Sequence, residues 1–385
     1  MNEDWKYRQL SEVASIKSGY TPSSYDLFDE GDYPYFKVGD MNAEGNEVYL
    51  HYSDSYLKAP CKTFPQGAIV FPKNGAAIGT NKKRILKQAS VVDLNTAILI
   101  PNDDIRTEFL YYWLQRIDFR EITRRGAVPT LDIQELKLSL VPLLSIAEQE
   151  RIVAELDLLS GIIDKQKAQL KELDILAQSI FYDMFGSVDD NKEGFEVETL
   201  NQVFSLITDG THQTPEYTED REKGFKFLSA KDVVSGKIDW TNIKYIPESL
   251  HIELHKRLAP QRGDILLCKN GTTGICALVE TDEVFDIYVS LALLRTSRTL
   301  SKKYLVAAIN NPSTKRQFDE SLKGIGVPNL HLGEIKKTRI IVPPLDLQES
   351  FEKKISIIEK EKESINQSIA ESQKLFDYTM DKYFS

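Results

Sequence analysis

The sequence lacks the features of secreted and membrane proteins. It holds 3 cysteines among its 385 residues, and none stands in a Cys-x-x-Cys pair, which argues against a disulfide framework and against a cysteine-based zinc site. No apolar run approaches the roughly 18–20 residues that a membrane span requires, and the opening residues form no apolar signal segment. These absences predict a cytoplasmic protein with no membrane partner.

The common catalytic motifs are missing as well. The sequence contains no glycine-rich phosphate loop, no Gly-x-Ser-x-Gly nucleophile motif and no Asn-Pro-Pro-aromatic motif of the adenine methyltransferases. His251 and His255 are spaced for one face of a helix, but the sequence suggests no third ligand beside them. We therefore expect neither a metal site nor a catalytic residue.

What the sequence does contain is an internal repeat of about 200 residues. Both copies have the same landmarks in the same order, from a Leu-x-x-Val opening through a Gly-Asp-Ile-Leu-like strand to a Val-Pro turn. The matched pairs are Leu10 and Leu200, Gly19 and Gly210, Lys73-Asn-Gly75 and Lys269-Asn-Gly271, and Val128-Pro129 and Val327-Pro328. The sequence therefore predicts two copies of one globular unit.

A long helix is expected after each copy. Apolar residues recur at alternating steps of four and three, which is the period of a coiled coil, so the two helices are expected to pair with each other. The pairing residues are predicted to be Leu156, Leu159, Ile163, Leu170, Leu173 and Ile180 in the first helix and Ile355, Ile358, Ile365, Ile369 and Phe376 in the second. Gln166 and Lys362 interrupt the stripe; they either fix the helix register or are simply tolerated there.

The predicted architecture alternates globular and helical parts. The boundaries place globular domains at residues 1–142 and 191–342 and long helices at 143–190 and 343–385. Strands are expected at 68–71, 91–100, 265–268 and 287–294, and shorter helices at 108–122 and 302–310. Each globular domain is therefore predicted to be α+β, and the long helices to pair as an antiparallel coiled coil.

The two Glu-x-Lys sequences deserve a separate interpretation, because they resemble the end of a nuclease signature. Glu135-Leu-Lys137 and Glu334-Ile-Lys336 stand at the same point of the repeat, just after the Val-Pro turn. A repeated structural position explains them better than catalysis. A stand-alone nuclease that uses these residues stays a minor alternative.

The charge distribution points to a nucleic acid. The net charge is −10, but the segments 143–194 and 343–385 carry nine of the ten surplus negative charges, and the globular domains are nearly neutral. The stretch 55–92 contains seven basic residues and no acidic one, and the stretch 287–318 contains six and none. Basic stretches on neutral domains suit contact with phosphates, although such runs are also common on ordinary solvated faces.

The Lys-Asn-Gly loops are the best candidates for reading DNA. Asn-Gly favours a turn with positive φ, where bare backbone can approach a ligand closely; the alternative is a hairpin turn that only closes a sheet. The predicted DNA-binding residues lie in these loops, in the basic stretches and around the Val-Pro turns. They are Lys73, Asn74, Lys82, Lys83, Arg84, Arg124, Arg125, Thr130, Lys269, Asn270, Thr272, Thr273, Lys323 and Asn329.

Taken together, these motifs resemble the specificity subunit of type I restriction–modification systems over nearly the whole chain. The resemblance rests on the duplicated order of the landmarks and on the segment Glu148-Gln149 where the first long helix begins. The second copy reads Leu347-Gln348-Glu349 and lacks that Glu-Gln pair, and the first loop has Ala76-Ala77 where Thr or Ser is more usual.

The resemblance implies a non-catalytic chain that acts with partners. Each globular domain would be a target recognition domain that reads one half of a bipartite site in double-stranded DNA. The helices would set the spacer and dock DNA methyltransferase subunits. S-adenosylmethionine, ATP and Mg would be bound by the methyltransferase and by a restriction/translocase subunit, and none by this chain. The competing interpretation is a coiled-coil adaptor that binds proteins and no DNA.

Overall fold

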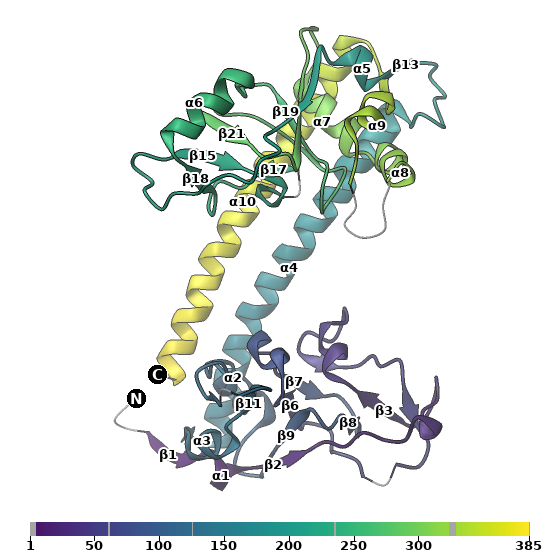
Figure 1. Cartoon of the computed structure of the whole chain (residues 1–385). Helices are drawn as coiled ribbons and strands as arrows, with labels where there is room; N and C mark the ends of the chain where they lie inside the picture. Colours follow the sequence, from purple (N-terminus) through teal and green to yellow (C-terminus); the bar gives the residue numbers. More distant parts are fainter. Residues whose placement is uncertain (1–4, 61, 125, 235, 323–328, 385) are drawn as a thin grey trace. The chain divides into compact units, whose positions relative to one another are not determined.

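The computed structural model describes residues 5–60, 62–124, 126–234, 236–322 and 329–384. The chain divides into two compact units, each described here by itself. Unit 1 comprises Met1–Lys167 together with Asn366–Ser385, and unit 2 comprises Ala168–Ile365. Each unit therefore contains one globular part and one end of both long helices. The α+β fold class predicted from the sequence is confirmed (Figure 1).

The globular part of unit 1 is built on a five-stranded sheet in the order β2-β9-β6-β7-β4, with a three-stranded sheet β5-β3-β8 beside it. Two strand pairs, β1-β12 and β10-β11, complete it. The strands are β1 (Lys6–Gln9), β2 (Ala14–Ser18), β3 (Tyr33–Phe36), β4 (Tyr49–Leu50), β5 (Tyr56–Leu57), β6 (Ile69–Pro72), β7 (Arg84–Leu86), β8 (Val91–Val92), β9 (Thr96–Pro101), β10 (Thr123–Arg124), β11 (Thr130–Leu131) and β12 (Leu140–Leu143). The helices are α1 (Leu10–Val13), α2 (Thr107–Gln115) and α3 (Ile133–Leu138), and the 3-10 turns are η1 (Ser24–Asp26), η2 (Val38–Asn42) and η3 (Ala76–Thr80).

The globular part of unit 2 has a four-stranded sheet, β14-β22-β19-β20, and a three-stranded sheet, β18-β15-β21. The strands are β13 (Glu196–Thr199), β14 (Leu206–Asp209), β15 (Phe225–Leu228), β16 (Val233–Val234), β17 (Lys237–Ile238), β18 (Lys244–Ile246), β19 (Ile265–Cys268), β20 (Cys276–Leu278), β21 (Phe285–Ile287), β22 (Leu291–Arg295) and β23 (Arg339–Val342). The helices are α5 (Leu200–Val203), α6 (Glu248–Arg257), α7 (Lys302–Asn310), α8 (Pro312–Glu320) and α9 (Leu332–Lys337), with a 3-10 turn η4 (Ala230–Asp232).

The two sheets repeat the same topology, which confirms the duplication. The antiparallel pairs β1-β12 and β2-β9-β6-β7 correspond to β13-β23 and β14-β22-β19-β20. In both units the small sheet contains one parallel pair, β3 with β8 and β15 with β21. A glycine from the repeated opening packs tightly in each: a Cβ on Gly19 or Gly210 would lie 2.2 or 2.0 Å from a backbone oxygen. Close backbone packing therefore requires glycine at these two positions.

Three predicted elements are corrected by the structure. The expected single strand 91–100 is divided into β8 and β9 by a turn in which the Asp93 carboxylate accepts from the backbone N–H of Asn95. The expected strand 287–294 is likewise divided, between β21 and β22. The helix expected at 108–122 ends at Gln115, where the N–H of Arg116 bonds back to Trp113 in a tighter final turn. An apolar run cannot reveal such turns when the turn residues are few.

The long helices α4 (Ile146–Phe185) and α10 (Leu345–Phe384) each contain 40 residues. In unit 1, Leu156 near the start of α4 shares a core with Tyr383 near the end of α10. In unit 2, Phe181 near the end of α4 packs on Phe351 near the start of α10. The helices therefore pair antiparallel, as predicted. Within the described residues, no helix has the length and apolar character needed to cross a bilayer.

The predicted stripe lies on the less exposed side of both helices. All eleven proposed pairing residues are buried or half-buried, whereas Leu158, Ile175 and Ile357, which stand off the stripe, are 63–70% exposed. Of the two interruptions, Gln166 donates to the Ser368 hydroxyl at 2.7 Å and Lys362 pairs with Asp174. Whether these polar contacts fix the register stays a prediction.

One glutamine anchors the start of each long helix. Gln149 is fully buried, accepts from the backbone of Arg106 and donates to two backbone carbonyls. Gln348 is equally buried, accepts from the N–H of Ser301 at 3.0 Å and donates to the carbonyl of Pro343 at 2.8 Å. The second copy therefore keeps the glutamine of the Glu-Gln pair in the same structural role, although it lacks the glutamate.

Candidate nucleic-acid interface

In unit 1 the Lys-Asn-Gly loop lies against the Val-Pro turn. Asn74 forms an isolated antiparallel bridge with Thr130. The N–H of Gly75 donates to the carbonyl of Pro129 at 2.8 Å, and the N–H of Leu131 donates to the carbonyl of Lys73 at 2.9 Å. Two motifs about 55 residues apart in the sequence thus form one surface.

Unit 2 repeats this arrangement. Asn270 bridges to Asn329, and the N–H of Leu330 donates to the carbonyl of Lys269 at 2.7 Å. Lys323 and the turn Val327-Pro328 lie outside the described residues. The structure thus brings Lys73, Asn74 and Thr130 together in one unit and Lys269, Asn270 and Asn329 together in the other.

The glycines of both loops have the predicted positive φ. Gly75 has a φ of 77° and Gly271 a φ of 75°. A Cβ built on either residue would meet no other atom within 4 Å. Gly271 is exposed and Gly75 is half-buried, and at both positions it is the conformation, not crowding, that favours glycine.

The lysines of the two loops have different surroundings. Lys73 is half-buried, and its ammonium donates to the Ser18 hydroxyl at 2.8 Å. Lys269 is buried, and its ammonium lies 2.5 Å from a carboxylate oxygen of Asp209, which is also buried. Burial alone would raise the pKa of Asp209, but the hydrogen bond and charge of Lys269 outweigh burial and lower it. Lys73 therefore presents more free charge than Lys269.

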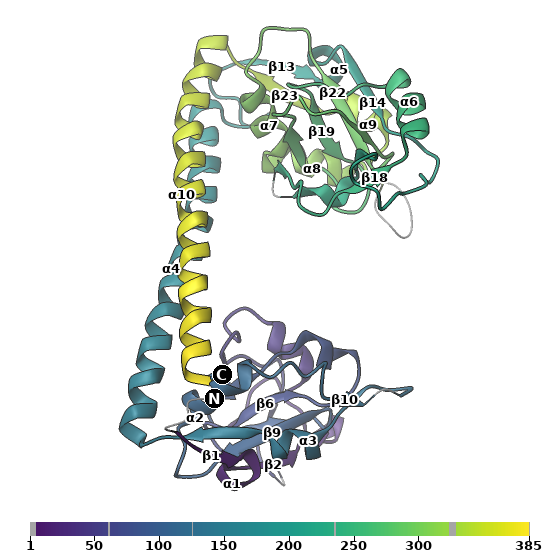
Figure 2. The same ribbon diagram turned by 90° about the vertical axis from the view of Figure 1, so that its left-hand side faces the viewer.

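The remaining loop candidates divide by exposure. Thr272 is exposed, whereas Thr273 is buried, and its carbonyl accepts from the Lys315 ammonium at 3.3 Å. Arg124 is exposed and pairs with Asp132 at 2.6 Å. It belongs to β10, the strand labelled in the globular part of unit 1 in Figure 2. Arg125 lies outside the described residues.

The basic stretch of unit 1 is less uniform than its sequence suggests. Lys82 is half-buried, and its ammonium bonds to the amide oxygen of Asn42. Arg84 is half-buried and donates to the carbonyls of Lys83 and Met41. Lys83 is fully buried, although its sequence neighbours suggest a surface lysine.

The Lys83 ammonium is held inside the domain. It donates to Asn81 Oδ1 and to the carbonyl of Ile117, both at 2.8 Å, and lies 4.1 Å from the centre of the Phe119 ring. Burial lowers its pKa from 10.5 to about 7. A phosphate contact by Lys83 would require this side chain to leave its pocket, so its burial argues against that part of the site prediction.

The buried lysine predicts a pH dependence of stability. The folded chain holds this proton less tightly than the unfolded chain, so the unfolded chain binds more protons between pH 7 and 10. The free energy of unfolding is therefore expected to gain up to about 1.4 kcal/mol per pH unit from Lys83 in this range. Urea unfolding of the wild type and of Lys83→Met at pH 7, 8 and 9 measures it. Equal slopes for both proteins would contradict the lowered pKa.

Comparison with known proteins decides the family. The sequence profile described as the type I restriction modification DNA specificity domain matches residues 2–174 and 192–372, once for each copy. The chain belongs to this DNA specificity family. Family membership establishes a role in DNA sequence specificity and confirms the resemblance found in the sequence.

Relatives of this specificity family align along almost the full chain. The type I restriction enzyme MjaIX specificity subunit of Methanocaldococcus jannaschii is 23% identical over 91% of this chain and 85% of its own length. The EcoBI specificity subunit of Escherichia coli is 20% identical over 96% of this chain and 82% of its own length. The chain thus spans most of these specificity subunits.

Solved structures share the fold of this specificity chain. The type I restriction–modification S subunit from M. genitalium has a TM-score of 0.54 at 15% identity, covering 100% of this chain and 97% of its own. A chain from a structure on complex assembly and conformational transition of the type I R-M system has a TM-score of 0.58 at 16% identity, with 100% and 98% coverage. At these identities the likeness is one of fold.

The sequence of this specificity chain did not predict three residues of the candidate interface. Ser18 and Asp209 stand just before the glycines of the repeated opening, and each is the partner of a loop lysine. Asn95 accepts from the Asn74 amide at 3.5 Å, and its carbonyl accepts from the N–H of Lys73. Ser18 and Asp209 occupy equivalent positions in the two repeats, and this equivalence could have identified them from the sequence.

The Glu-x-Lys residues of the specificity chain lie on short helices. Glu135 and Lys137 are on α3, and Glu334 and Lys336 are on α9. Among the described residues, neither glutamate belongs to a group of three side chains able to hold a metal ion. Their equivalent places on equivalent helices support the structural explanation.

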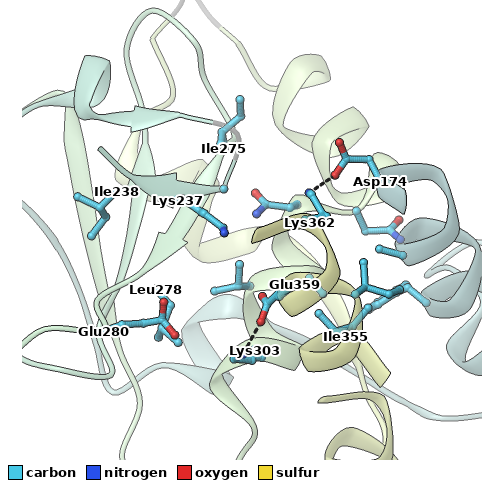
Figure 3. Close-up of a pocket in the computed structure, with 18 of the residues that line it drawn as sticks. Asp174, Lys237, Ile238, Ile275, Leu278, Glu280, Lys303, Ile355, Glu359 and Lys362 are labelled. Atoms are coloured by element: carbon cyan, nitrogen blue, oxygen red, sulfur yellow. Dashed lines mark hydrogen bonds and ion pairs between the residues drawn. The ribbon is translucent and has the colours of Figure 1, made fainter. Parts of the chain in front are cut away.

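A cavity of about 990 Å³ lies in unit 2 beside α4 and α10 (Figure 3). Its wall combines apolar side chains such as Ile355 of α10 and Leu278 of β20 with paired charges. Lys303 pairs with Glu359, and Lys362 with Asp174. Both of these lysines are therefore neutralised by a carboxylate beside them, which makes the cavity a poor site for a phosphate.

Proposed function

We propose that this chain reads an asymmetric, bipartite site in double-stranded DNA for a type I restriction–modification complex. Each globular part reads one half of the site, α4 and α10 set the spacing between the halves, and the helices dock DNA methyltransferase subunits. The chain itself is non-catalytic and acts on cellular DNA in the cytoplasm.

One observation carries this proposal: both units place a Lys-Asn-Gly loop against the segment after a Val-Pro turn. The bridges Asn74–Thr130 and Asn270–Asn329 hold short polar side chains beside a glycine turn with positive φ. Amide and hydroxyl side chains read base edges, and backbone N–H groups and lysines hold phosphates. A loop that served only to close a sheet would not need this repeated set of polar groups.

The two halves of the site are proposed to be unlike. The first loop continues with Ala76 and Ala77, whereas the second continues with Thr272 and Thr273. The loop lysine is paired with a hydroxyl in unit 1 and with a carboxylate in unit 2. Different contact groups select different bases, at roughly 1–3 kcal/mol for each mismatched pair. A perfectly palindromic target would contradict this proposal.

The long helices suit both spacing and docking. A helix of 40 residues is about 60 Å long, which exceeds the roughly 34 Å that separates two readers on one face of B-DNA. Off the pairing stripe they carry several exposed apolar side chains, and exposed apolar patches mark protein interaction sites. These side chains include Leu158, Ile175, Leu176, Ile357, Leu375 and Tyr378. We assign them to the methyltransferase interface.

The chemistry is assigned to the partners. Methyl transfer from S-adenosylmethionine belongs to the methyltransferase subunits, and ATP- and Mg-dependent cleavage belongs to a restriction/translocase subunit. This chain supplies the recognition of the target DNA sequence.

Lys82 is expected to contact a phosphate. Its ammonium bonds to the neutral amide of Asn42 in an exposed contact, so it is available for an ion contact. Lys82→Ala should reduce the slope of log K against log salt by about 1, without changing which sequence is preferred. Binding of the assembled complex to its target at 50–250 mM salt measures the slope.

Lys83→Met is the matched control for this measurement. It removes a lysine from the neighbouring position, but the amino group of Lys83 is buried, so the slope should stay that of the wild type. If Lys82→Ala leaves the slope unchanged, Lys82 is not a phosphate contact. If Lys83→Met lowers the slope, the burial argument fails.

The test of the whole proposal is DNA binding by this chain in complex with its methyltransferase partner. We expect specific binding to one bipartite sequence, lost when either half is scrambled. A coiled-coil adaptor would assemble with the partner but add no sequence preference. Metal-dependent cleavage by this chain alone would favour a nuclease that uses the Glu-x-Lys residues.

A further inference from the structure

Unit 2 contains a buried cluster of two histidines and an aspartate. His251 and His255 stand one turn apart on α6, which packs on β21, and Asp286 is the middle residue of β21 (Figure 1). His251 Nδ1 lies 2.7 Å from Asp286 Oδ2, and His255 Nδ1 lies 3.5 Å from Asp286 Oδ1. The fold thus supplies the third ligand that the histidine pair lacks in the sequence.

Two atoms of this cluster have no hydrogen-bond partner within the part of the chain that the structure describes. They are His255 Nδ1 and Asp286 Oδ1, which face each other across 3.5 Å. Asp286 is only 1% exposed, so water does not readily satisfy its oxygen. A buried carboxylate oxygen left without a partner is costly, and a cation between the two atoms would satisfy both of them.

The spacing of these atoms fits a metal ion. Two ligand atoms at about 2.1 Å from a tetrahedral zinc ion are about 3.4 Å apart, close to the distance between His255 Nδ1 and Asp286 Oδ1. The ligand atoms of all three residues lie within 4.8 Å of one another. No other group of three such side chains was found among the described residues. We propose that His251, His255 and Asp286 bind one zinc-like divalent transition-metal ion.

When no ion is bound, a hydrogen bond between His251 Nδ1 and Asp286 Oδ2 at 2.7 Å holds these two side chains together. Metal binding displaces the proton of this hydrogen bond from His251 Nδ1, because a ligating imidazole nitrogen must be unprotonated. The Phe225 ring stacks on the His251 ring at 3.7 Å between centroids and holds it in position. Three protein ligands leave a fourth position for water.

The ion would fasten α6 to the small sheet of unit 2. At the end of α6, Arg257 donates to the carbonyl of Asp209 at 3.0 Å, and the carboxylate of Asp209 holds Lys269. A metal that fixes α6 would therefore also stabilise the base of the second Lys-Asn-Gly loop. The metal site does not depend on the proposed function, because it concerns only the stability of unit 2.

Cobalt binding tests the site directly, because tetrahedral Co²⁺ absorbs visible light. The full chain, freed of any histidine tag and stripped with chelator, is titrated with Co²⁺ and then with Zn²⁺. We expect one equivalent of Co²⁺ with a visible band that Zn²⁺ abolishes, and a higher unfolding temperature with Zn²⁺. His255→Gln and Asp286→Asn should each weaken binding at least tenfold.

The variants and a control separate a metal site from a polar cluster. Asp286→Asn keeps the size of the side chain, and His255→Gln alters a half-exposed residue, so folding of each is checked by circular dichroism. His51→Gln removes a histidine from unit 1 and should bind as the wild type does. If the wild type takes up no stoichiometric Co²⁺, or if both folded variants bind as tightly, the cluster is a polar contact only and the proposal is wrong.

Discussion

Deleting seven residues from each long helix is expected to abolish binding to the normal DNA target. Residues 165–171 of α4 lie opposite residues 363–369 of α10, since Gln166 bonds to Ser368. Removing both heptads preserves the apolar stripe but shortens each helix by about 10 Å. That length corresponds to about three base pairs and about 100° around the DNA axis. One half-site is then lost, and affinity should fall at least 100-fold.

Binding of the assembled complex to targets with spacers of every length measures this effect. A control variant keeps both lengths but replaces only the exposed residues of the same heptads, and it should bind the normal target. Unaltered affinity and spacing after the double deletion would refute the role of the helices in setting the spacer. If the control also loses binding, the effect reflects methyltransferase docking.

Phe185→Ala is expected to cost unit 2 about 3–5 kcal/mol of its free energy of unfolding. Phe185 is 1% exposed at the end of α4, and its ring contacts Phe181, Tyr304 and Phe351 at 5.0–5.5 Å between centroids. These rings come from α4, α7 and α10, so the cavity left by the substitution would loosen both long helices from the globular part. Urea unfolding followed by tyrosine and tryptophan fluorescence measures the loss.

Ile175→Ala is the matched control on the same helix. Ile175 is 63% exposed, so its truncation leaves no cavity, and alanine favours the helix. We expect a change of about 0.5 kcal/mol or less. Comparable losses for both variants would show that the helix end does not belong to the core of unit 2.

The sequence predicted those parts of the fold that periodicity and repetition encode. The heptad stripe predicted α4 and α10, and the duplicated landmarks predicted two equal topologies. The turn at Asp93 and the early end of α2 were not predicted, because a few local hydrogen bonds decide them against the apolar pattern. Element type is fixed by long patterns and element ends by single contacts.

The sequence proposed residues for the candidate interface, but it did not reveal their contacts or their burial. Asn74 and Asn270 were proposed from the loop alone, but their pairing with Thr130 and Asn329 follows only from the fold. Lys83 stands among surface lysines in the sequence, and only the tertiary structure buries it. Asp286, which completes the cluster with His251 and His255, lies on β21 and not on α6, so no local spacing in the sequence reveals it.

Genome-wide mapping of N6-methyladenine tests the central claim most directly. Cells that encode the methyltransferase partner are compared with and without the gene for this chain. We expect methylation to disappear from one asymmetric, bipartite motif and to return when the wild-type gene is restored. No change at any motif, or loss at a palindromic motif alone, would contradict the assignment of this chain as the reader of two unlike half-sites.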